Sequence, residues 1–326
     1  MELQVTVTHP LTTLAKRVLI TGGAGFIGSH IADAIIQRGA ECLILDDLSS
    51  GRRENVPAGA TFVQGDICDE LVLARVFADF RPDVVCHQAA QASVSVSVRE
   101  PVRDADVNVV GTLRLLDMCV RSGVKRFVFA STGGAIYGEV PEGTRAKIAT
   151  PPAPLSPYAC SKLAVEHYLR CFEHLHGIQS IVLRYANVYG PRQDPHGEAG
   201  VVAIFTERIL SGKPVRIYAR KMEGDDGCVR DYTHVSDVVR ANLTAIFGEE
   251  PARCTNVCTG VATTTLALAL AIEKASGMRA EIGFGPMRIG DVERSVLEPL
   301  PSAMPVSLAD GLTETVTWFF ANAAAR

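Results

Sequence analysis

Two residues one helical turn apart, Tyr158 and Lys162, have the types and the spacing of a general base and its activator. Ser156 and Pro157 precede them and are typical of an N-cap and a first helical position, so a helix is predicted to begin here. Both side chains then lie on one helix face. An ammonium ~6 Å from a phenol, at an effective dielectric constant of ~20, favours the phenolate by ~3 kcal/mol, or about two pKa units. We therefore expect the pKa of Tyr158 to fall toward about 7 or 8, where the phenol is a general base.

The same spacing is common in surface pairs, and a glycine-rich turn supplies the context that favours catalysis. Gly22, Gly25 and Gly28 follow the apolar run Val18–Thr21 and open a helical pattern. Such glycines permit a tight turn, close approach of the backbone to phosphate, and packing of helix on strand, which predicts a pyrophosphate cradle. Asp46 ends the next apolar run, where a carboxylate accepts ribose hydroxyls and repels a 2′-phosphate. The pattern favours NAD over NADP, and a bound nicotinamide cation is expected to add to the lowering of the pKa of Tyr158.

The first half of the chain alternates short apolar runs with helical patterns. Six runs are predicted strands: Val18–Thr21, Cys42–Asp46, Thr61–Gln64, Val84–His87, Phe127–Ser131 and Ile181–Tyr185. This alternation predicts an α/β fold with a Rossmann-type doubly wound parallel sheet, whose ligands bind at the carboxyl ends of the strands. Asp66, after the third run, either reaches the adenine or belongs to a surface turn.

Beyond Tyr185 the pattern is less regular and is punctuated by Gly and Pro, which predicts a smaller, discontinuous C-terminal substrate domain. Alternation partly resumes at Tyr232–Val235 and Thr255–Cys258. The expected division is an NAD-binding domain of residues 1–187 with a returning segment at about 232–261, and a second domain of residues 188–231 and 262–326. Pro141–Pro157 holds five prolines and is expected to be a loop at the active-site rim.

The composition excludes several classes of function. The 326 residues carry 32 Lys and Arg against 36 Asp and Glu, a net charge of −4 with no basic block, so nucleic acid is not an expected partner. No apolar stretch is long enough to span a membrane, and the first 17 residues lack the pattern of a secretory signal, so we expect a cytoplasmic protein. Nine scattered cysteines, including Cys42, Cys86, Cys119 and Cys171 in apolar segments, fit reduced core thiols. The pair Cys254 and Cys258 lacks further ligands, so no metal is expected.

Motifs along nearly the whole chain resemble the extended short-chain dehydrogenases/reductases, specifically the NAD-dependent epimerase/dehydratase family. Within it, the chain is similar to the members that interconvert UDP-glucose and UDP-galactose. The segments that carry the resemblance are Thr21–His30, His87–Ala90, Asn108, Ser131–Gly138, Tyr158 with Lys162, Leu183–Arg192, Arg230–Val235 and Arg288–Asp291.

The resemblance implies the site residues. The residues that it implies for NAD binding are Gly22, Gly25, Phe26, Ile27, Gly28, Asp46, Asp47, Asp66, Ile67, Gln88, Ala89, Ala90, Asn108, Ser131, Tyr158, Lys162 and Tyr185. The residues that it implies for UDP-sugar binding are Thr132, Asn187, Val201, Arg230, Arg288, Asp291 and Ser295. Two arginines suit a diphosphate, because guanidinium groups bind its oxygens in bidentate geometry.

The hydroxyl that partners Tyr158 is less narrowly defined by the sequence. Counting from the preceding strand favours Thr132, with Ser131 as the alternative. Family members that eliminate water carry an Asp-Glu pair directly after this position, and decarboxylases usually carry a Glu in the loop, whereas this chain has Gly133-Gly134. The resemblance thus implies oxidation and re-reduction without elimination.

The implied enzyme is an NAD-dependent 4-epimerase of UDP-hexoses. Tyr158 would remove the proton of the sugar 4-hydroxyl with Thr132 bridging, and a 4-keto sugar would turn over before hydride returns to its other face. Ser295 lies where the family has a residue that gates the sugar pocket, and its small size implies that N-acetyl sugars are also accepted. After this position, family members usually carry a stretch that contains Lys and Trp. This chain has a shorter, Pro-rich stretch there, followed by the expected final helix near Ala309–Ala323.

Two other functions stay open from the sequence. One is a 4-epimerase or net oxidoreductase on another nucleotide sugar, such as UDP-glucuronate, and the other is a non-catalytic NAD-binding regulator. The resemblance also implies a homodimer that pairs helices near residues 102–120 and 157–175.

Overall fold

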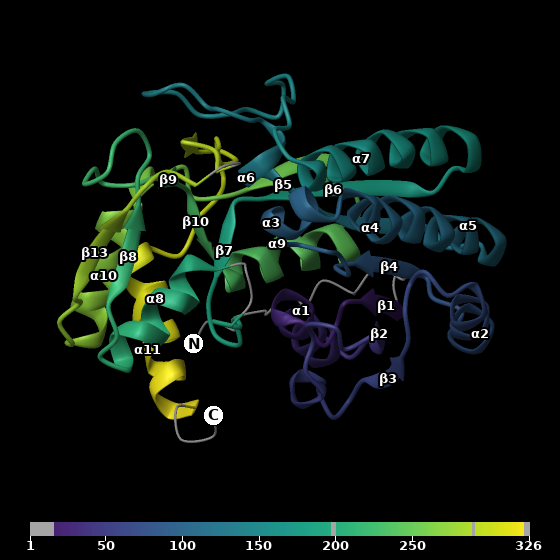
Figure 1. The fold of residues 1–326 in the computed structure, drawn as a ribbon. Helices are drawn as coiled ribbons and strands as arrows, with labels where there is room; N and C mark the ends of the chain where they lie inside the picture. Colours follow the sequence, from purple (N-terminus) through teal and green to yellow (C-terminus); the bar gives the residue numbers. More distant parts are fainter. Residues whose placement is uncertain (1–15, 197–199, 289–290, 323–326) are drawn as a thin grey trace, which may run out of the picture.

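Seven parallel strands form the central sheet (Figure 1). In spatial order they are β11 (Cys254–Val257), β6 (Gln179–Tyr185), β5 (Arg126–Thr132), β4 (Val84–His87), β1 (Arg17–Thr21), β2 (Glu41–Asp46) and β3 (Thr61–Gln64). The computed structural model describes residues 16–196, 200–288 and 291–322. Parts of several predicted features therefore lie outside the described residues. They are residues 1–15 of the stretch in which we expect no signal, Gly197 of the second domain, Ile289 and Gly290 of the segment Arg288–Asp291, and Ala323 of the final helix.

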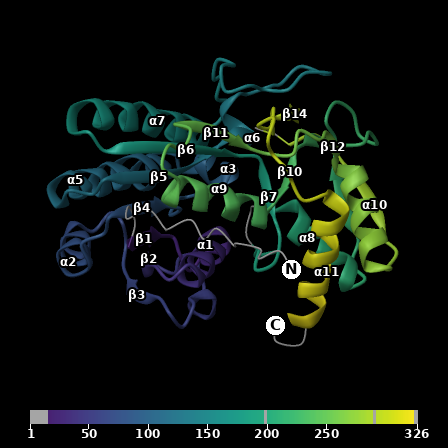
Figure 2. The ribbon, with the colours of Figure 1, turned by 180° about the vertical axis from the view of Figure 1, so that it is seen from behind.

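Helices cover both faces of this sheet, as Figures 1 and 2 show. On one face α1 (Phe26–Gln37) and α9 (Val235–Phe247) pack on alternate strand residues such as Val18 and Ile20. On the other, α2 (Glu70–Phe80), α5 (Thr112–Ser122) and α7 (Pro157–His176) pack on the intervening ones such as Leu19. Burial on both sides explains why the strands are almost continuously apolar.

All six predicted strands belong to this sheet. Two have the predicted bounds, and the other four are longer by one or two residues at an end. The predicted strand Tyr232–Val235 differs, because it ends at His234 and pairs with β7 (Asn187–Tyr189) outside the large sheet. The strand predicted at Thr255–Cys258 is β11, which begins at Cys254 and ends at Val257.

A second group of elements lies beyond the carboxyl ends of the central strands. Its strands are β8 (Val215–Tyr218) with β13 (Ile282–Gly285), β10 (Tyr232–His234) with β7, and β9 (Val229–Arg230) between β12 (Thr263–Thr264) and β14 (Arg294–Ser295). Its helices are α8 (Val201–Leu210), α10 (Thr265–Ser276) and α11 (Leu308–Asn322). A separate apolar core formed by Phe205, Ile217, Leu268 and Leu312, among others, joins these elements.

Short helical segments connect the larger elements. They are η1 (Arg53–Asn55), α3 (Val94–Arg99), α4 (Pro101–Ala105), the π-helical turn η2 (Asp106–Gly111) and α6 (Gly133–Ile136). All nine cysteines are free thiols, and Cys42, Cys86 and Cys119 are buried as expected. The expectation for Cys171 is wrong, because it lies on the solvent side of α7 and is exposed. Among the described residues, no group of three or more metal-ligating side chains is placed to hold an ion, and within the same ranges no helix could cross a bilayer.

A buried ion pair ties α7 to the sheet. Glu166 on α7 accepts hydrogen bonds from Arg184 on β6, at 3.0 Å from Nε and 2.5 Å from Nη2, and both side chains are buried. Arg184 Nη1 also donates to the hydroxyl of Tyr137 at 2.7 Å. Since a buried charge is stable only when it is paired, this contact is expected to hold α7 in one position on the sheet.

We predict that Glu166→Ala lowers the free energy of unfolding by about 3–5 kcal/mol, because it leaves the Arg184 charge buried and unpaired. Urea denaturation measures this change. Glu173→Ala is the matched control on the same helix, where the more exposed pair with Arg253 is expected to contribute less than about 1 kcal/mol. Equal losses in the two variants would contradict the prediction.

Candidate active site

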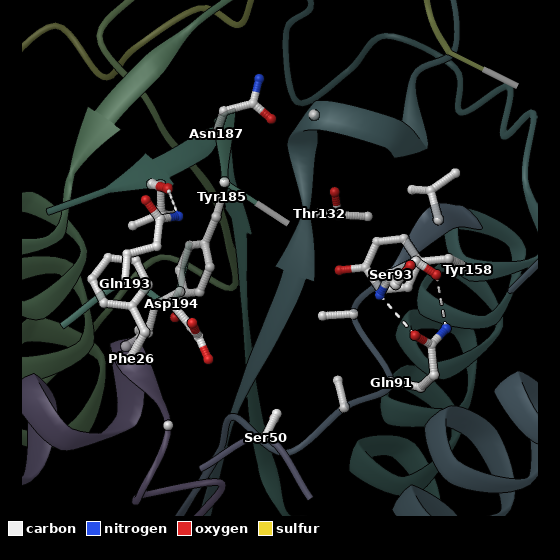
Figure 3. Close-up of a pocket in the computed structure, with 18 of the residues that line it drawn as sticks. Phe26, Ser50, Gln91, Ser93, Thr132, Tyr158, Tyr185, Asn187, Gln193 and Asp194 are labelled. Atoms are coloured by element: carbon white, nitrogen blue, oxygen red, sulfur yellow. Dashed lines mark hydrogen bonds between the residues drawn. The ribbon is translucent and has the colours of Figure 1, made fainter. Parts of the chain in front are cut away.

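One large cavity of about 1160 Å³ runs along the carboxyl edge of the central sheet. The turn after β1 lines one end, and Arg230, Arg288 and Asp291 line the other. All the residues predicted from the sequence line it except Asn108 and Ser295. In Figure 3, Thr132 and Tyr158 stand across the cavity from Gln193 and Asp194, with Phe26 near the latter pair.

The glycines of the first turn are needed for three different steric reasons. Gly22 has φ +70°, and a Cβ on it would lie 2.6 Å from the backbone nitrogen of Ala89. A Cβ on Gly28 would lie 2.2 Å from the oxygen of Gly22, so this glycine lets α1 pack against the turn. A Cβ on Gly25 would meet that oxygen at 3.2 Å and would otherwise occupy the cavity. No side chain caps α1, so its first amides are available to an anion.

Acidic residues follow β2 and β3 at this end of the cavity. The buried carboxylate of Asp46 accepts hydrogen bonds from the amides of Ala24 at 2.9 Å and Leu48 at 2.8 Å. Burial raises the pKa of Asp46, although these amides oppose the shift. Asp47 and Asp66 are exposed and line the same end, together with Ile67.

The start of α7 has the predicted geometry. The side chain of Ser156 accepts a hydrogen bond from the amide of Ala159 at 3.3 Å, and Pro157 is the first helical residue. This cap directs Tyr158 and Lys162 into the cavity. Of the long loop before the helix, Leu155 and Ser156 reach the cavity wall, so the loop does form part of the rim.

The side chain of Lys162 is buried beneath the tyrosine. Its ammonium donates to the carbonyl of Ala130 at 2.9 Å and lies 5.9 Å from the centre of the Tyr158 ring and 4.8 Å from that of Phe129. Burial lowers the pKa of Lys162 to about 8.

The expected lowering of the pKa of Tyr158 by Lys162 is not what the protein environment produces. Burial raises the pKa of Tyr158 to about 12, Asp104 adds to the rise, and a hydrogen bond with the Thr132 hydroxyl opposes it. The cost of taking a phenolate out of water exceeds its attraction to the ammonium of Lys162. The side chains of the protein by themselves therefore do not bring the pKa of Tyr158 toward neutral pH, and the expected contribution of a nicotinamide cation stays a prediction.

The two hydroxyls that the sequence left as alternatives point in different directions. The hydroxyl of Thr132 lies beside Tyr158, on the same side of the cavity (Figure 3). Ser131 donates to Glu166 at 2.6 Å, so its hydroxyl is engaged with the buried ion pair. The geometry favours Thr132 as the hydroxyl beside the base.

The two glycines after Thr132 also differ. A Cβ on Gly133 would lie 2.3 Å from the side chain of Leu297, whereas Gly134 lines the cavity and a Cβ there would approach Asn187 at 3.4 Å. The first glycine is required by packing, and the second leaves space beside the expected sugar position.

Gln88, Ala89, Ala90 and Tyr185 line the middle of the cavity. The hydroxyl of Tyr185 accepts a hydrogen bond from Asn242 Nδ2 at 2.7 Å and lies near Gln88, which fixes its ring at the cavity wall (Figure 3). Burial raises the pKa of this tyrosine, so it stays neutral.

At the far end, Arg288 forms an ion pair with Asp291, whose Oδ2 lies 3.0 Å from Nε and 2.9 Å from Nη2. Its guanidinium also lies 4.5 Å from the ring centre of Tyr218 on β8. Arg230, Asn187 and Val201 line the same end. Ser295 does not, because β14 pairs with β9 and buries this serine beside the backbone of Arg230.

Asn108 is the other predicted residue that lies outside the cavity wall. It is buried in η2, where its Oδ1 accepts from the amide of Gln91 at 3.0 Å and its Nδ2 donates to the carbonyl of that residue at 2.9 Å. Its effect on the site is therefore exerted through the loop that carries Gln91, a cavity-lining residue.

The chain matches the model of the NAD dependent epimerase/dehydratase family over residues 18–257. It belongs to this family. It is 44% identical to a UDP-glucose 4-epimerase of Mycolicibacterium smegmatis over 314 residues, which cover 93% of this chain and 98% of the relative. Its fold matches the crystal structure of the Thermus thermophilus UDP-glucose 4-epimerase in complex with NAD (TM-score 0.89, 53% identity, 93% and 99% of the two chains covered). It also matches the Thermotoga maritima enzyme with UDP-glucose (TM-score 0.89, 46% identity, 94% and 99% covered).

The structure brings several residues to the site that the sequence did not indicate. Tyr218 stacks on Arg288, and Arg52 Nη2 donates to Asp194 at 3.2 Å across the cavity. Asp104 is buried, and its carboxylate accepts hydrogen bonds from Gln91 and from Ser161 on α7. Tyr218 is the last residue of β8, and nothing in the spacing of this short strand indicates which of its faces meets the cavity.

We predict that Gly25→Ala and Gly28→Ala separate ligand binding from folding. Gly28→Ala is expected to lower the melting temperature strongly, because its Cβ overlaps backbone. Gly25→Ala is expected to keep a near-normal melting temperature and to weaken NAD retention by at least tenfold, because its methyl group occupies the cradle. Thermal melting and NAD content after gel filtration measure the two effects, and normal NAD content in Gly25→Ala would contradict the prediction.

Proposed function

We propose that this protein catalyses the NAD-dependent 4-epimerisation of UDP-hexoses, interconverting UDP-glucose and UDP-galactose. The observation that carries the proposal is the placement of Tyr158, Thr132 and Lys162 in the middle of a single cavity. A phosphate cradle lies at one end of that cavity, and a pair of arginines lies at the other. The relatives with NAD and with UDP-glucose support the same reading.

The residues at the cradle fit NAD. The uncapped N-terminus of α1 suits the pyrophosphate, and Asp46 is a buried carboxylate where an adenosine ribose would lie. Bound NAD would supply a hydride acceptor that is regenerated in each turnover. Under this proposal residues 1–187 and about 232–261 form the NAD-binding part, and residues 188–231 and 262–326 form the UDP-sugar-binding part.

The far end of the cavity fits a uridine diphosphate. Arg230 and Arg288 would bind the diphosphate, and Asp291 would accept ribose hydroxyls once its bond with Arg288 opens. Asn187 and Val201 would contact the nucleotide-sugar from neighbouring elements. This arrangement anchors the substrate by its nucleotide, so that binding energy does not fix the orientation of the reacting ring.

In the proposed mechanism, Tyr158 accepts the proton of the sugar 4-hydroxyl and later returns a proton to the same oxygen. Thr132 lies beside Tyr158 and would relay or orient that proton. Lys162 would stabilise the phenolate from beneath the ring. The space beside Gly134 would let the 4-keto sugar turn over, and no acid in α6 is available for elimination.

The experiment that tests this function is incubation with a panel of UDP-sugars followed by separation of the epimers. We expect UDP-glucose and UDP-galactose to interconvert without a net change in nicotinamide absorbance. Accumulation of NADH would instead indicate a net oxidoreductase, and turnover of UDP-glucuronate alone would indicate the other epimerase activity. The buried Ser295 provides no gate at the cavity wall, so acceptance of N-acetyl sugars is a separate prediction that the same panel decides.

Tyr158→Phe is predicted to lower the epimerisation rate by about 10²- to 10⁴-fold, because it removes the general base, while NAD stays bound. The rate and the NAD content of the purified variant measure the two effects. Cys160→Ser, on the exposed face of the same helical turn, is the control and is expected to keep the normal rate. A normal rate in Tyr158→Phe would exclude this residue as the base.

We further propose a homodimer formed by the helices of residues 101–122 and 157–176. Helices α4, α5 and α7 run side by side in Figures 1 and 2. Exposed apolar side chains on these elements and their neighbours support the proposal: Val98, Val102, Val110, Tyr168 and Leu175. Pairing of this face with a second copy would cover them.

Val102→Asp is predicted to shift the protein from dimer to monomer, because it places a charge on a side chain that is 73% exposed in the single chain. Light scattering after gel filtration measures the mass. Phe320→Asp on α11, at the other end of the molecule, is the control and should leave the dimer intact. A wild-type mass of one chain at micromolar concentration would contradict the proposal.

A further inference from the structure

A fully buried carboxylate lies behind the catalytic pair. Asp104, on α4, has no exposed surface. Its Oδ1 accepts hydrogen bonds from Gln91 Nε2 at 2.7 Å and Asn108 Nδ2 at 3.0 Å, and its Oδ2 accepts from Ser161 Oγ at 2.7 Å. These donors come from a cavity-lining loop, from η2 and from α7.

The position of Ser161 makes this contact relevant to catalysis. Ser161 directly precedes Lys162 and lies one turn beyond Tyr158, so its bond to Asp104 fixes the part of α7 that carries the pair. Gln91, the second partner, is held further by Ser93, as Figure 3 shows. One carboxylate thus joins the catalytic helix to the wall of the cavity.

The other charged groups near the pair are already neutral or compensated. His87 on β4 is bonded to Thr21 at 2.6 Å and Thr112 at 2.9 Å, and burial lowers its pKa to about 3, so it is uncharged. Glu166, one turn beyond Lys162, is paired with Arg184. On α4 itself, Arg103 lines the cavity and pairs with Glu100 at its surface. On η2, Asp106 is the remaining acidic group, and it is exposed, so water screens its charge.

We propose that Asp104 is a positioning residue for the Tyr158–Lys162 pair: its carboxylate holds the first turns of α7 against the Gln91 loop and supplies the negative charge against which the pair ionises. The negative charge favours the protonated amine and disfavours the phenolate, consistent with the direction of its effect on both groups. The proposal rests on the proposed function for its meaning in catalysis, but its electrostatic part can be measured without turnover.

Asp104→Asn removes the charge and keeps the shape. The new amide oxygen can accept from Gln91 and Asn108 as before, and the new amide nitrogen can donate to the hydroxyl of Ser161. Removal of a negative charge lowers the pKa of a nearby cation and of a nearby phenol alike. We therefore expect the whole pH–rate profile of epimerisation to move by roughly one pH unit to lower pH. Ser161→Ala is the matched control, because it removes one hydrogen bond and keeps the charge, so its profile is expected to stay in place.

The second readout is the titration of Lys162 by NMR with ¹³C-labelled lysine. The chain has seven lysines, so the resonance can be assigned by its loss in Lys162→Arg. We expect the titration midpoint of Lys162 to lie near pH 8 in the wild type and in Ser161→Ala. In Asp104→Asn we expect it to lie roughly one pH unit lower.

An unchanged midpoint in a folded Asp104→Asn variant would overturn the proposal. If that variant does not fold, Asp104→Ser removes the same charge and the same fall is expected. Absence of epimerase activity in the wild type would refute the proposed function, and the NMR titration would still decide the role of Asp104.

Discussion

The site depends on one geometric constraint, which is that all strands of the central sheet run in the same direction. Parallel strands joined by helical crossovers end at one edge, so whatever follows each strand meets there. The turn after β1, Asp46 at the end of β2, Gln88 after β4 and Thr132 at the end of β5 are far apart in the sequence and line one cavity. The second group of elements packs beyond this edge and completes the cavity without adding a strand to the sheet.

Burial determines how the catalytic pair behaves within that cavity. It disfavours the phenolate of Tyr158 and the ammonium of Lys162 at the same time, so the protein environment by itself opposes charge separation in the pair. In the proposed mechanism, the positive charge of bound NAD would favour the phenolate.

Buried polar contacts hold the helix that carries this pair from both sides. Glu166 joins α7 to β6 through Arg184 and also engages Ser131, while Ser161 joins it to α4 through Asp104. Such contacts are directional, whereas apolar packing alone tolerates small shifts. They hold the part of α7 that carries Tyr158 and Lys162, and they leave the hydroxyl of Thr132, unlike that of Ser131, beside Tyr158.

The sequence alone determined the features that depend on neighbours along the chain: the strands and their order of alternation, the glycine turn, the Ser156 cap and the spacing of Tyr158 and Lys162. It also identified most of the cavity wall, because strand ends and family motifs mark it. Only the tertiary structure decided that the hydroxyl of Thr132 and not that of Ser131 lies beside Tyr158, that Asn108 and Ser295 lie outside the cavity wall, that burial raises the pKa of Tyr158, and that Asp104 joins three elements. The physical reason is that side-chain direction, desolvation and buried hydrogen bonds arise where distant segments pack together, and local spacing carries no information about those contacts.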